Sequence, residues 1–233
     1  MPQRTDRDRP LLAVLIDADN VPAKHAESIL REITSVGEPA LRRVYGDWSS
    51  DRLNSWNNKL LSLGLVAVQE TANTKGKNAS DIGLVIDAMD ILHQGRFDGF
   101  VLVSSDSDFT ALANRLREDG LMVIGIGEKK TPEALRNVVN RFIFIENLDG
   151  APPQEKPAEK AASALPLIEA AMSKLDQDDE WYNLGQIGQT IQAAHPDFDT
   201  RSYGHGKLSA LVRQINSLET RKDGARLMVK LRG

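Results

Sequence analysis

Four aspartates stand where neighbouring strand ends could gather them. Asp17 immediately follows the apolar run LLAVLI at 11–16, and Asp106 and Asp108 lie in SSDSDF at the end of another apolar run, GFVLVSS. Asp81, in KGKNASDIG, opens a segment of helical character. Converging carboxylates repel one another and raise each other's pKa unless a cation offsets their charge. These four residues therefore predict a cluster that binds a divalent metal ion.

The residue types also indicate which ion and which chemistry. Carboxylate oxygens with positions left for water suit Mg²⁺ or Mn²⁺ rather than zinc. Such an ion lowers the pKa of a bound water and stabilises charge on a leaving oxygen, so no protein nucleophile is needed. The chain has no cysteine, which excludes disulfides, thiolate zinc sites and a cysteine nucleophile, and none of its four histidines lies in the cluster.

Each aspartate also has a structural interpretation. Asp81 and Asp108 could both be helix N-caps. Another functional interpretation stays open. It is a phosphatase that uses Asp17 and Asp19 as an Asp-x-Asp pair, although no clear lysine follows a later strand.

Several polar residues are candidates for supporting roles. Asn20 could orient a carboxylate or bind a phosphate, or it could cap the helix expected from Pro22. Lys75 and Lys77, in the polar loop TANTKGKN, could contact RNA phosphates or be solvated. Asp19 is a less central acid.

Asp87 and two tryptophans have weaker claims to a role. Asp87 lies about 120° round the helix from Asp81, so the two cannot share a face, and its role is at most supporting. Trp48 and Trp56 could stack on bases or pack beneath a helix.

Strands and helices alternate along the first two thirds of the chain. Apolar runs predict strands at 11–16, 41–46, 65–70, 99–105, 121–127 and 141–146. Helical spacing predicts helices at 22–36, 51–63, 79–93, 108–119 and 132–139. This alternation is typical of an α/β fold in which helices flank a parallel sheet. Such sheets place their sites beyond the carboxyl ends of the strands.

The chain divides into four parts: a flexible N-terminus at 1–10, a large domain at 11–148, a linker at 149–163 and a small domain at 164–233. The linker prediction rests on DGAPPQEKPAEKAASA, which lacks large apolar residues. Beyond it, helices at 164–175, 184–194 and 204–217 precede a hairpin with the turn Asp223-Gly224. Three helices and a hairpin predict a small winged helix-turn-helix domain.

Charge is distributed unevenly along the chain. Residues 199–233 carry eight bases and three acids, a net charge of +5, so the remainder carries −9 of the total of −4. A basic segment of this kind suits a phosphate backbone. Within it, Lys207 and Arg213 lie on the polar side of the helix expected at 204–217 and could contact RNA, or they could be ordinary solvated charges.

The sequence contains no membrane or export signal. No apolar run approaches the roughly 20 residues that span a bilayer. The N-terminus, MPQRTDRDRP, has no apolar stretch after its charges, so it is not a secretory signal. The expectation is a cytoplasmic protein without a membrane partner.

Three blocks of the first domain resemble the NYN domain, a LabA-like branch of the PIN-like ribonuclease superfamily. They are LIDADNV, KGKNASDIGLVIDAM and VLVSSDSDFTALANRLREDGLMVIGIG, and the resemblance covers about 10–147. It implies a PIN-like, Rossmannoid sheet and a metal-dependent ribonuclease. The positions that match the acidic catalytic and metal-binding motif are Asp17, Asp81, Asp106 and Asp108. Asn20 matches the Asn of the first block. Lys77 lies near the family's Lys-Gly element, but this sequence departs from that element and reads Lys75-Gly76-Lys77.

The end of the chain resembles another family. FDTRSYGHGKLSALVRQI at 198–215, with LGQIGQTI before it, is similar to the OST-HTH/LOTUS domain over about 164–233. Matching positions are Tyr203, Gly204, Lys207 and Leu208, and of these Tyr203 and Lys207 are candidates for contacting RNA. The resemblance implies a winged-helix module that binds RNA or a protein partner. Together the two resemblances favour an endoribonuclease that is targeted by its own RNA-binding domain. The alternative is a non-catalytic RNA-binding regulatory protein with an idle acidic pocket.

Overall fold

The structure is a computed structural model of the 233-residue chain, and it describes residues 8–49, 51–69, 79–148, 157–177 and 179–232. The chain forms two compact units, Met1–Asp149 and Gly150–Gly233. Each unit is described by itself below.

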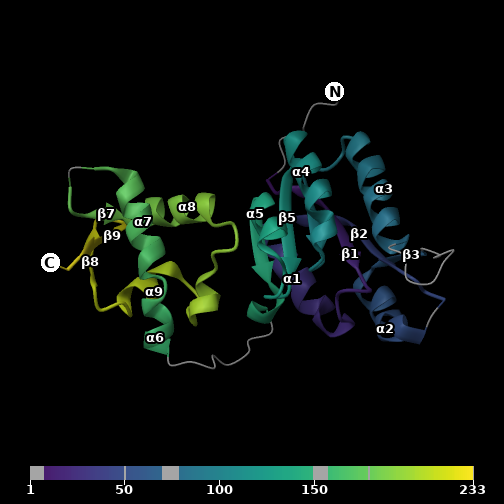
Figure 1. Cartoon of the computed structure of the whole chain (residues 1–233), viewed down its shortest axis with the longest axis horizontal. Coiled ribbons are helices and arrows are strands. Elements are labelled where there is room, and N and C mark those ends of the chain that lie inside the picture. The colour runs from purple at the N-terminus through teal and green to yellow at the C-terminus, as the bar shows by residue number, and fades with distance from the viewer. Residues whose placement is uncertain (1–7, 50, 70–78, 149–156, 178, 233) are drawn as a thin grey trace. The chain divides into compact units, whose positions relative to one another are not determined.

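The first unit is built on a six-stranded parallel sheet with the order β3-β2-β1-β4-β5-β6 (Figure 1). Its strands are β1 (Leu11–Asp17), β2 (Glu38–Gly46), β3 (Val66–Gln69), β4 (Gly99–Val103), β5 (Met122–Gly127) and β6 (Arg141–Phe144). All five neighbouring pairs are parallel. The predicted α/β fold with a central parallel sheet is therefore confirmed.

Helices cover both faces of this sheet, as Figure 1 shows. The helices are α1 (Ala26–Val36), α2 (Asn54–Leu63), α3 (Ala79–His93), α4 (Thr110–Glu118) and α5 (Glu133–Val138). One face of β1, through Val14 and Ile16, packs in the same cluster as Ile29 of α1 and Trp56 of α2. The other face, through Leu15, packs with the buried side chains of α3, α4 and α5. All seven residues of β1 are buried, as expected of a strand covered on both sides.

The strand order reverses direction between β1 and β4. From β1 the chain builds outward to β2 and β3 on one side, and then returns to place β4, β5 and β6 on the other. Parallel sheets bind ligands at such a reversal point, outside the carboxyl ends of the two central strands. Because Ile16 pairs with Val103, the next residues, Asp17 and Ser104, leave the sheet side by side.

Element boundaries largely follow the prediction, with local differences at helix starts. The helix expected at 79–93 is confirmed as α3. Three other helices begin with a short 3-10 turn: η1 (Ala23–His25), η2 (Asp51–Leu53) and η3 (Ser107–Phe109). Turns of this kind are common at helix ends because they use backbone groups that lack an α-helical partner.

The second unit combines helices with a three-stranded sheet. Its elements are α6 (Pro157–Ala162), α7 (Leu165–Leu175), β7 (Tyr182–Asn183), α8 (Leu184–Ala194), η5 (Thr200–Tyr203), α9 (Leu208–Arg213), β8 (Leu218–Asp223) and β9 (Arg226–Leu231). The antiparallel sheet has the order β7-β9-β8. Ile168, Ile187, Leu211 and Val229 meet in its core. The helices predicted at 164–175 and 184–194 are present as α7 and α8, and the predicted hairpin is present as β8 and β9.

The second unit differs from the prediction in three details. The expected linker at 149–163 contains α6, because Ala161 is buried in the core of this unit. The helix expected at 204–217 is only α9, since Gly204 is left-handed at φ 82° and Lys207 is extended. The hairpin turn is Gly224-Ala225, because Asp223 still pairs with Arg226.

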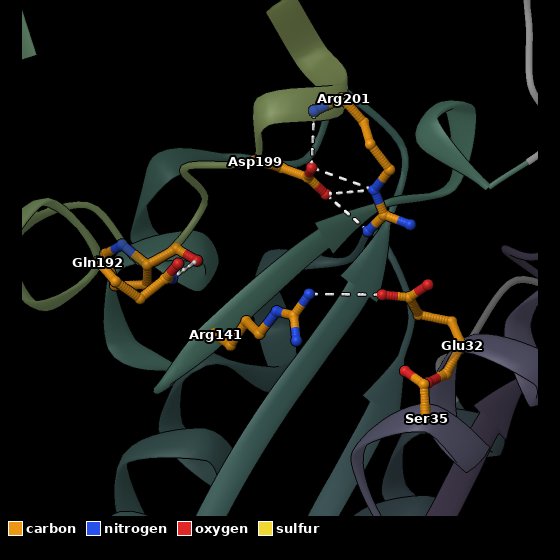
Figure 2. A network of polar contacts seen from close by, with 7 residues as sticks. Glu32, Ser35, Arg141, Gln192, Asp199 and Arg201 are labelled. Carbon is orange, nitrogen blue, oxygen red and sulfur yellow. Dashed lines mark hydrogen bonds and ion pairs between the residues drawn. The ribbon is translucent and has the colours of Figure 1, made fainter. Parts of the chain in front are cut away.

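Each unit contains side-chain ion pairs. In the first unit, Arg141 of β6 reaches Glu32 of α1 at 3.4 Å. In the second, the Arg201 guanidinium lies on the Asp199 carboxylate with contacts of 2.6 to 3.0 Å (Figure 2). The backbone N–H of Arg201 also donates to Asp199, so this aspartate caps η5.

Among the helices that the structure describes, none is both long enough and apolar enough to cross a membrane.

Candidate functional site

Asp17, the last residue of β1, has a buried carboxylate held by four hydrogen bonds. Its Oδ1 accepts from the backbone N–H groups of Asp19 at 3.1 Å and Asn20 at 3.2 Å. Its Oδ2 accepts from the side-chain amide of Asn20 at 2.7 Å and from the Ser104 hydroxyl at 2.8 Å. Only 1% of Asp17 is exposed. Burial raises its pKa, and the hydrogen bonds from Asn20 and Ser104 offset part of that increase.

Ser104 connects Asp17 with the loop that follows β4. Its hydroxyl donates to Asp17 and also accepts from the backbone N–H of Asp106 at 3.1 Å. The residue is 3% exposed. Sequence analysis did not single it out, because two consecutive serines follow the apolar run and only the pairing of β1 with β4 shows which one meets Asp17. A serine at the end of the strand next to a predicted carboxylate is the signal that could have found it.

Asp106 and Asp108 occupy the turn after β4. Asp106 caps η3, because its Oδ1 accepts from the backbone N–H of Asp108 at 2.9 Å. The structural interpretation of Asp108 as an N-cap is therefore wrong, and Asp106 has that role. Asp108 itself is exposed on the turn.

Asp81 is the aspartate whose pKa responds to the charges of the other acids. It is the third residue of α3 and is partly buried. Burial, followed by the negative charges of Asp17, Asp106, Asp108 and Asp19, raises its pKa from 3.8 to about 6. The hydrogen bonds of Ser104 connect Asp17 with Asp106, and α3, which carries Asp81, packs in the same hydrophobic cluster as β1.

The donor set has the chemistry of a site for a hard divalent cation. Aspartate oxygens are the ligands that Mg²⁺ and Mn²⁺ prefer, and the charges that act most strongly on Asp81 are all negative. Within the described ranges, no three His, Asp or Glu side chains stand close enough to hold one ion as they are placed. Binding would therefore require the carboxylates to draw together.

Asn20 orients the Asp17 carboxylate, which was one of its two predicted functional roles. Its side-chain amide bonds to Asp17 rather than to a helix end. The alternative of an N-cap is wrong, since the residue that precedes η1 is Pro22 and it makes no side-chain cap. Asp19 lies at the rim of the cluster, 3.8 Å from Arg52.

Asp87 contacts β2 and not the other predicted acids. Its carboxylate forms an ion pair with Arg43 and accepts a hydrogen bond from the Tyr45 hydroxyl. Burial, and then the bond to Asp87, raises the pKa of Tyr45. In place of the supporting site role that the sequence suggested, Asp87 fastens α3 to the sheet. It thereby fixes the helix on which Asp81 stands.

Of the remaining candidates of the first unit, the structure describes the two tryptophans but not the two lysines. Lys75 and Lys77 lie outside the described residues. Trp56 is 1% exposed and donates its indole N–H to the Val21 carbonyl, so its packing interpretation is confirmed. Trp48 is partly buried and donates to the Val68 carbonyl.

In the second unit, two of the three predicted RNA contacts are accessible. Lys207, just before α9, and Arg213, its last residue, are both exposed. Tyr203 is partly buried against the Phe198 ring, with the centroids 5.7 Å apart. Burial, and then the charge of Asp197, raises the pKa of Tyr203.

Replacing Ser104 with alanine tests whether its hydroxyl positions Asp17. Loss of a hydrogen bond to a metal-binding carboxylate typically weakens metal affinity or activity by about 10- to 100-fold. We expect a reduction in that range in Mn²⁺ affinity, measured by calorimetry. Ser107→Ala is the matched control, because Ser107 is an exposed serine of the same loop. Equal Mn²⁺ affinity in both variants would contradict the positioning role.

Comparison with known proteins identifies two domain families in the chain. The family model of the NYN domain matches residues 11–146, and that of the OST-HTH/LOTUS domain matches 157–229. No curated protein matches. Solved structures that resemble the chain include a protein of unknown function from Vibrio parahaemolyticus, with 21% identity and a TM-score of 0.49, over 60% of this chain and 94% of that chain. A LacI family transcriptional regulator from Brachyspira murdochii is 14% identical, with a TM-score of 0.30, over 71% of this chain and 40% of that chain.

Proposed function

The chain belongs to the NYN domain family, a branch of the PIN-like nucleases, and we propose that it is a divalent-metal-dependent endoribonuclease. Divalent metals are general cofactors of such nucleases, and we propose Mg²⁺ or Mn²⁺ here. The OST-HTH/LOTUS domain is an RNA-binding module, which supports RNA as the partner.

One observation carries the proposal. After burial, the negative charges of Asp17 at the end of β1 and of Asp106 and Asp108 in the turn after β4 raise the pKa of Asp81 at the start of α3, beside the reversal point of the sheet. That point is where parallel α/β sheets bind ligands. A cation offsets the repulsion between like charges, so the raised pKa of Asp81 favours a bound metal ion.

We assign the metal and the catalytic chemistry to Asp17, Asp81, Asp106 and Asp108. A bound divalent ion would supply an activated water and offset charge on the leaving oxygen of an RNA phosphodiester. Asn20 and Ser104 hold the Asp17 carboxylate in one orientation. A carboxylate offers about four lone-pair positions, so an ion that binds Asp17 must displace one of its four present donors.

The same geometry weighs against a phosphatase with an Asp-x-Asp nucleophile. The first acid of that pair, Asp17, is 1% exposed and each of its oxygens already accepts two hydrogen bonds. A carboxylate that attacks a phosphorus atom has to reach its substrate. As the side chain is placed, Asp17 has no free oxygen for direct attack, whereas a metal ion could take the place of one of its hydrogen-bond donors.

For RNA contacts we propose Lys75 and Lys77, which precede α3 in the sequence, and Lys207 and Arg213 of the second unit. The two residues of the second unit are exposed cations on and beside one helix. Exposed cations of this kind contact phosphates and position a nucleic acid without reading its sequence. Tyr203, which is packed against Phe198, is better suited to supporting that helix than to contacting RNA.

The function is tested by incubating the purified protein with end-labelled RNA in Mg²⁺, Mn²⁺ or EDTA. We expect internal cleavage products with a divalent ion, and none in EDTA, because the carboxylate cluster requires the ion. Activity on a small phosphomonoester is measured in parallel. Tight RNA binding without cleavage would instead support the non-catalytic alternative, and activity confined to the phosphomonoester would overturn the ribonuclease.

A further inference from the structure

The outer face of the sheet in the second unit carries a tryptophan in contact with two cations. Val229 and Leu218 point into the core, so the alternate residues of β8 and β9 point outward. Arg221 is on this outward side, opposite Met228, and Lys230 is opposite Glu219. Trp181 directly precedes β7, where Tyr182 pairs with Val229. Its ring therefore lies across the outward side of β9.

The cations contact the tryptophan ring itself. The Arg221 Cζ is 4.2 Å from the centroid of the indole, and the Lys230 Nζ is 5.1 Å from it. Both distances are within the roughly 6 Å range of a cation–π contact. Arg221 is exposed and Trp181 is partly exposed. A planar guanidinium is thus held over an aromatic ring at the surface.

The backbone around Trp181 keeps this ring in place. Its N–H donates to the Asp179 carboxylate at 3.0 Å, and its carbonyl accepts from the Gln177 side chain at 2.8 Å. The indole N–H makes no hydrogen bond within the part of the chain that the structure describes. The ring is positioned, and its one donor is available to a ligand.

We propose that Trp181, Arg221 and Lys230 form a stacking site for an unpaired base of RNA, and this site rests on the proposed role of RNA as partner. Aromatic rings and guanidinium planes are the surfaces on which unpaired bases stack. The indole N–H can donate to the base or to a phosphate oxygen. Single-stranded RNA fits best, because the bases of a duplex already stack on one another.

Charge alone does not account for this face. Lys230 lies 3.7 Å from Glu219 and 3.8 Å from Glu180, so part of its charge is already offset. A surface that attracted RNA only through phosphates would have few such acids. The stacked pair of Trp181 and Arg221 is what sets this face apart from the cations near α9, and it was not predicted from the sequence.

The test measures binding of full-length protein to a short single-stranded RNA in EDTA, where cleavage is prevented. Arg221→Ala should weaken binding by about 5- to 100-fold, the range of one lost base stack. Arg221→Lys keeps the positive charge but lacks the planar guanidinium group, so it should weaken binding nearly as much as Arg221→Ala. Arg226→Ala is the matched control, since Arg226 is an exposed arginine of the same hairpin and pairs with Asp223.

A spectroscopic measurement reports on the tryptophan directly. The chain has three tryptophans, so 5-fluorotryptophan labelling gives three ¹⁹F signals, and Trp181→Phe assigns one of them. We expect this signal to shift on addition of single-stranded RNA. An unshifted signal, or an Arg221→Lys variant that binds like the wild type, would overturn the stacking site. An inactive nuclease that still shows Arg221-dependent binding would overturn only the catalytic proposal.

Discussion

Replacement of Asp17 by asparagine should abolish RNA cleavage. We expect kcat/KM to fall by about 1,000-fold or more, equivalent to about 4 kcal/mol of transition-state stabilisation. The substitution keeps the shape of the side chain but removes its negative charge at the centre of the cluster. It also introduces an amide N–H donor next to the donor groups of Asn20, Asp19 and Ser104, which now all donate to the carboxylate. Single-turnover cleavage of labelled RNA at saturating Mn²⁺ measures the effect.

Asp90→Asn is the matched control for this substitution. Asp90 is an exposed acid on α3, so its replacement removes the same charge without touching the cluster. Its cleavage rate should equal that of the wild type. Thermal unfolding of both variants separates lost chemistry from lost folding. A folded Asp17→Asn protein that cleaves RNA at the normal rate would remove the basis of the proposed metal site.

Metal affinity should depend steeply on pH around the raised pKa of Asp81. A carboxylate must be deprotonated to bind a metal, and the pKa of Asp81 is about 6. If one proton is released for each ion bound, the Kd for Mn²⁺ should rise about tenfold per pH unit below that value and level off above it. Titration of Mn²⁺ by calorimetry across this range measures the dependence.

Asp81→Asn gives the control for this titration. The variant should bind Mn²⁺ weakly at every pH and lose the inflection near the pKa of Asp81. Asp90→Asn, with its exposed acid on the same helix, should retain the inflection. An inflection that persists in Asp81→Asn would assign the titration to another group.

The same shift affects the stability of the metal-free protein. The folded state binds the Asp81 proton more tightly than the unfolded chain does, because the pKa rises from 3.8 to about 6 on folding. The contribution of Asp81 to the free energy of unfolding is therefore greatest below pH 3.8 and is lost as the pH rises through about 6. The raised pKa of Asp17 has the same sign. Added Mn²⁺ should reverse the trend and raise the Tm more at neutral pH than at acidic pH.

Local patterns in the sequence predicted most of the secondary structure. LLAVLI became a strand buried on both sides, and the apolar spacing at 79–93 became α3. Such patterns predict well because they depend on residues that are close together along the chain. The linker prediction failed at α6 because PAEKAA has little apolar character of its own, and its helix is stabilised by the burial of Ala161 in a core made elsewhere.

The edge of the sheet at which two of the candidate acids lie could also be predicted from sequence. Asp17 and Asp106 each follow an apolar run, so parallel strands carry both to the same edge. The partners of these acids could not be predicted. Ser104 is 87 residues from Asp17, and Asp87 lies beside Arg43 and Tyr45 rather than beside the other acids. The contact of Trp181 with Arg221 also depends on strand pairing.

The sequence by itself determined which residues could bind a metal and which segments form strands and helices, because both follow from residue type and short-range spacing. Only the tertiary structure decided that β1 and β4 are neighbours and which serine donates a hydrogen bond to the Asp17 carboxylate. It also decided how strongly the other acids raise the pKa of Asp81. The physical reason is that hydrogen bonding, burial and charge interaction depend on distance in space. Those distances are set by the pairing of strands that lie far apart in the chain.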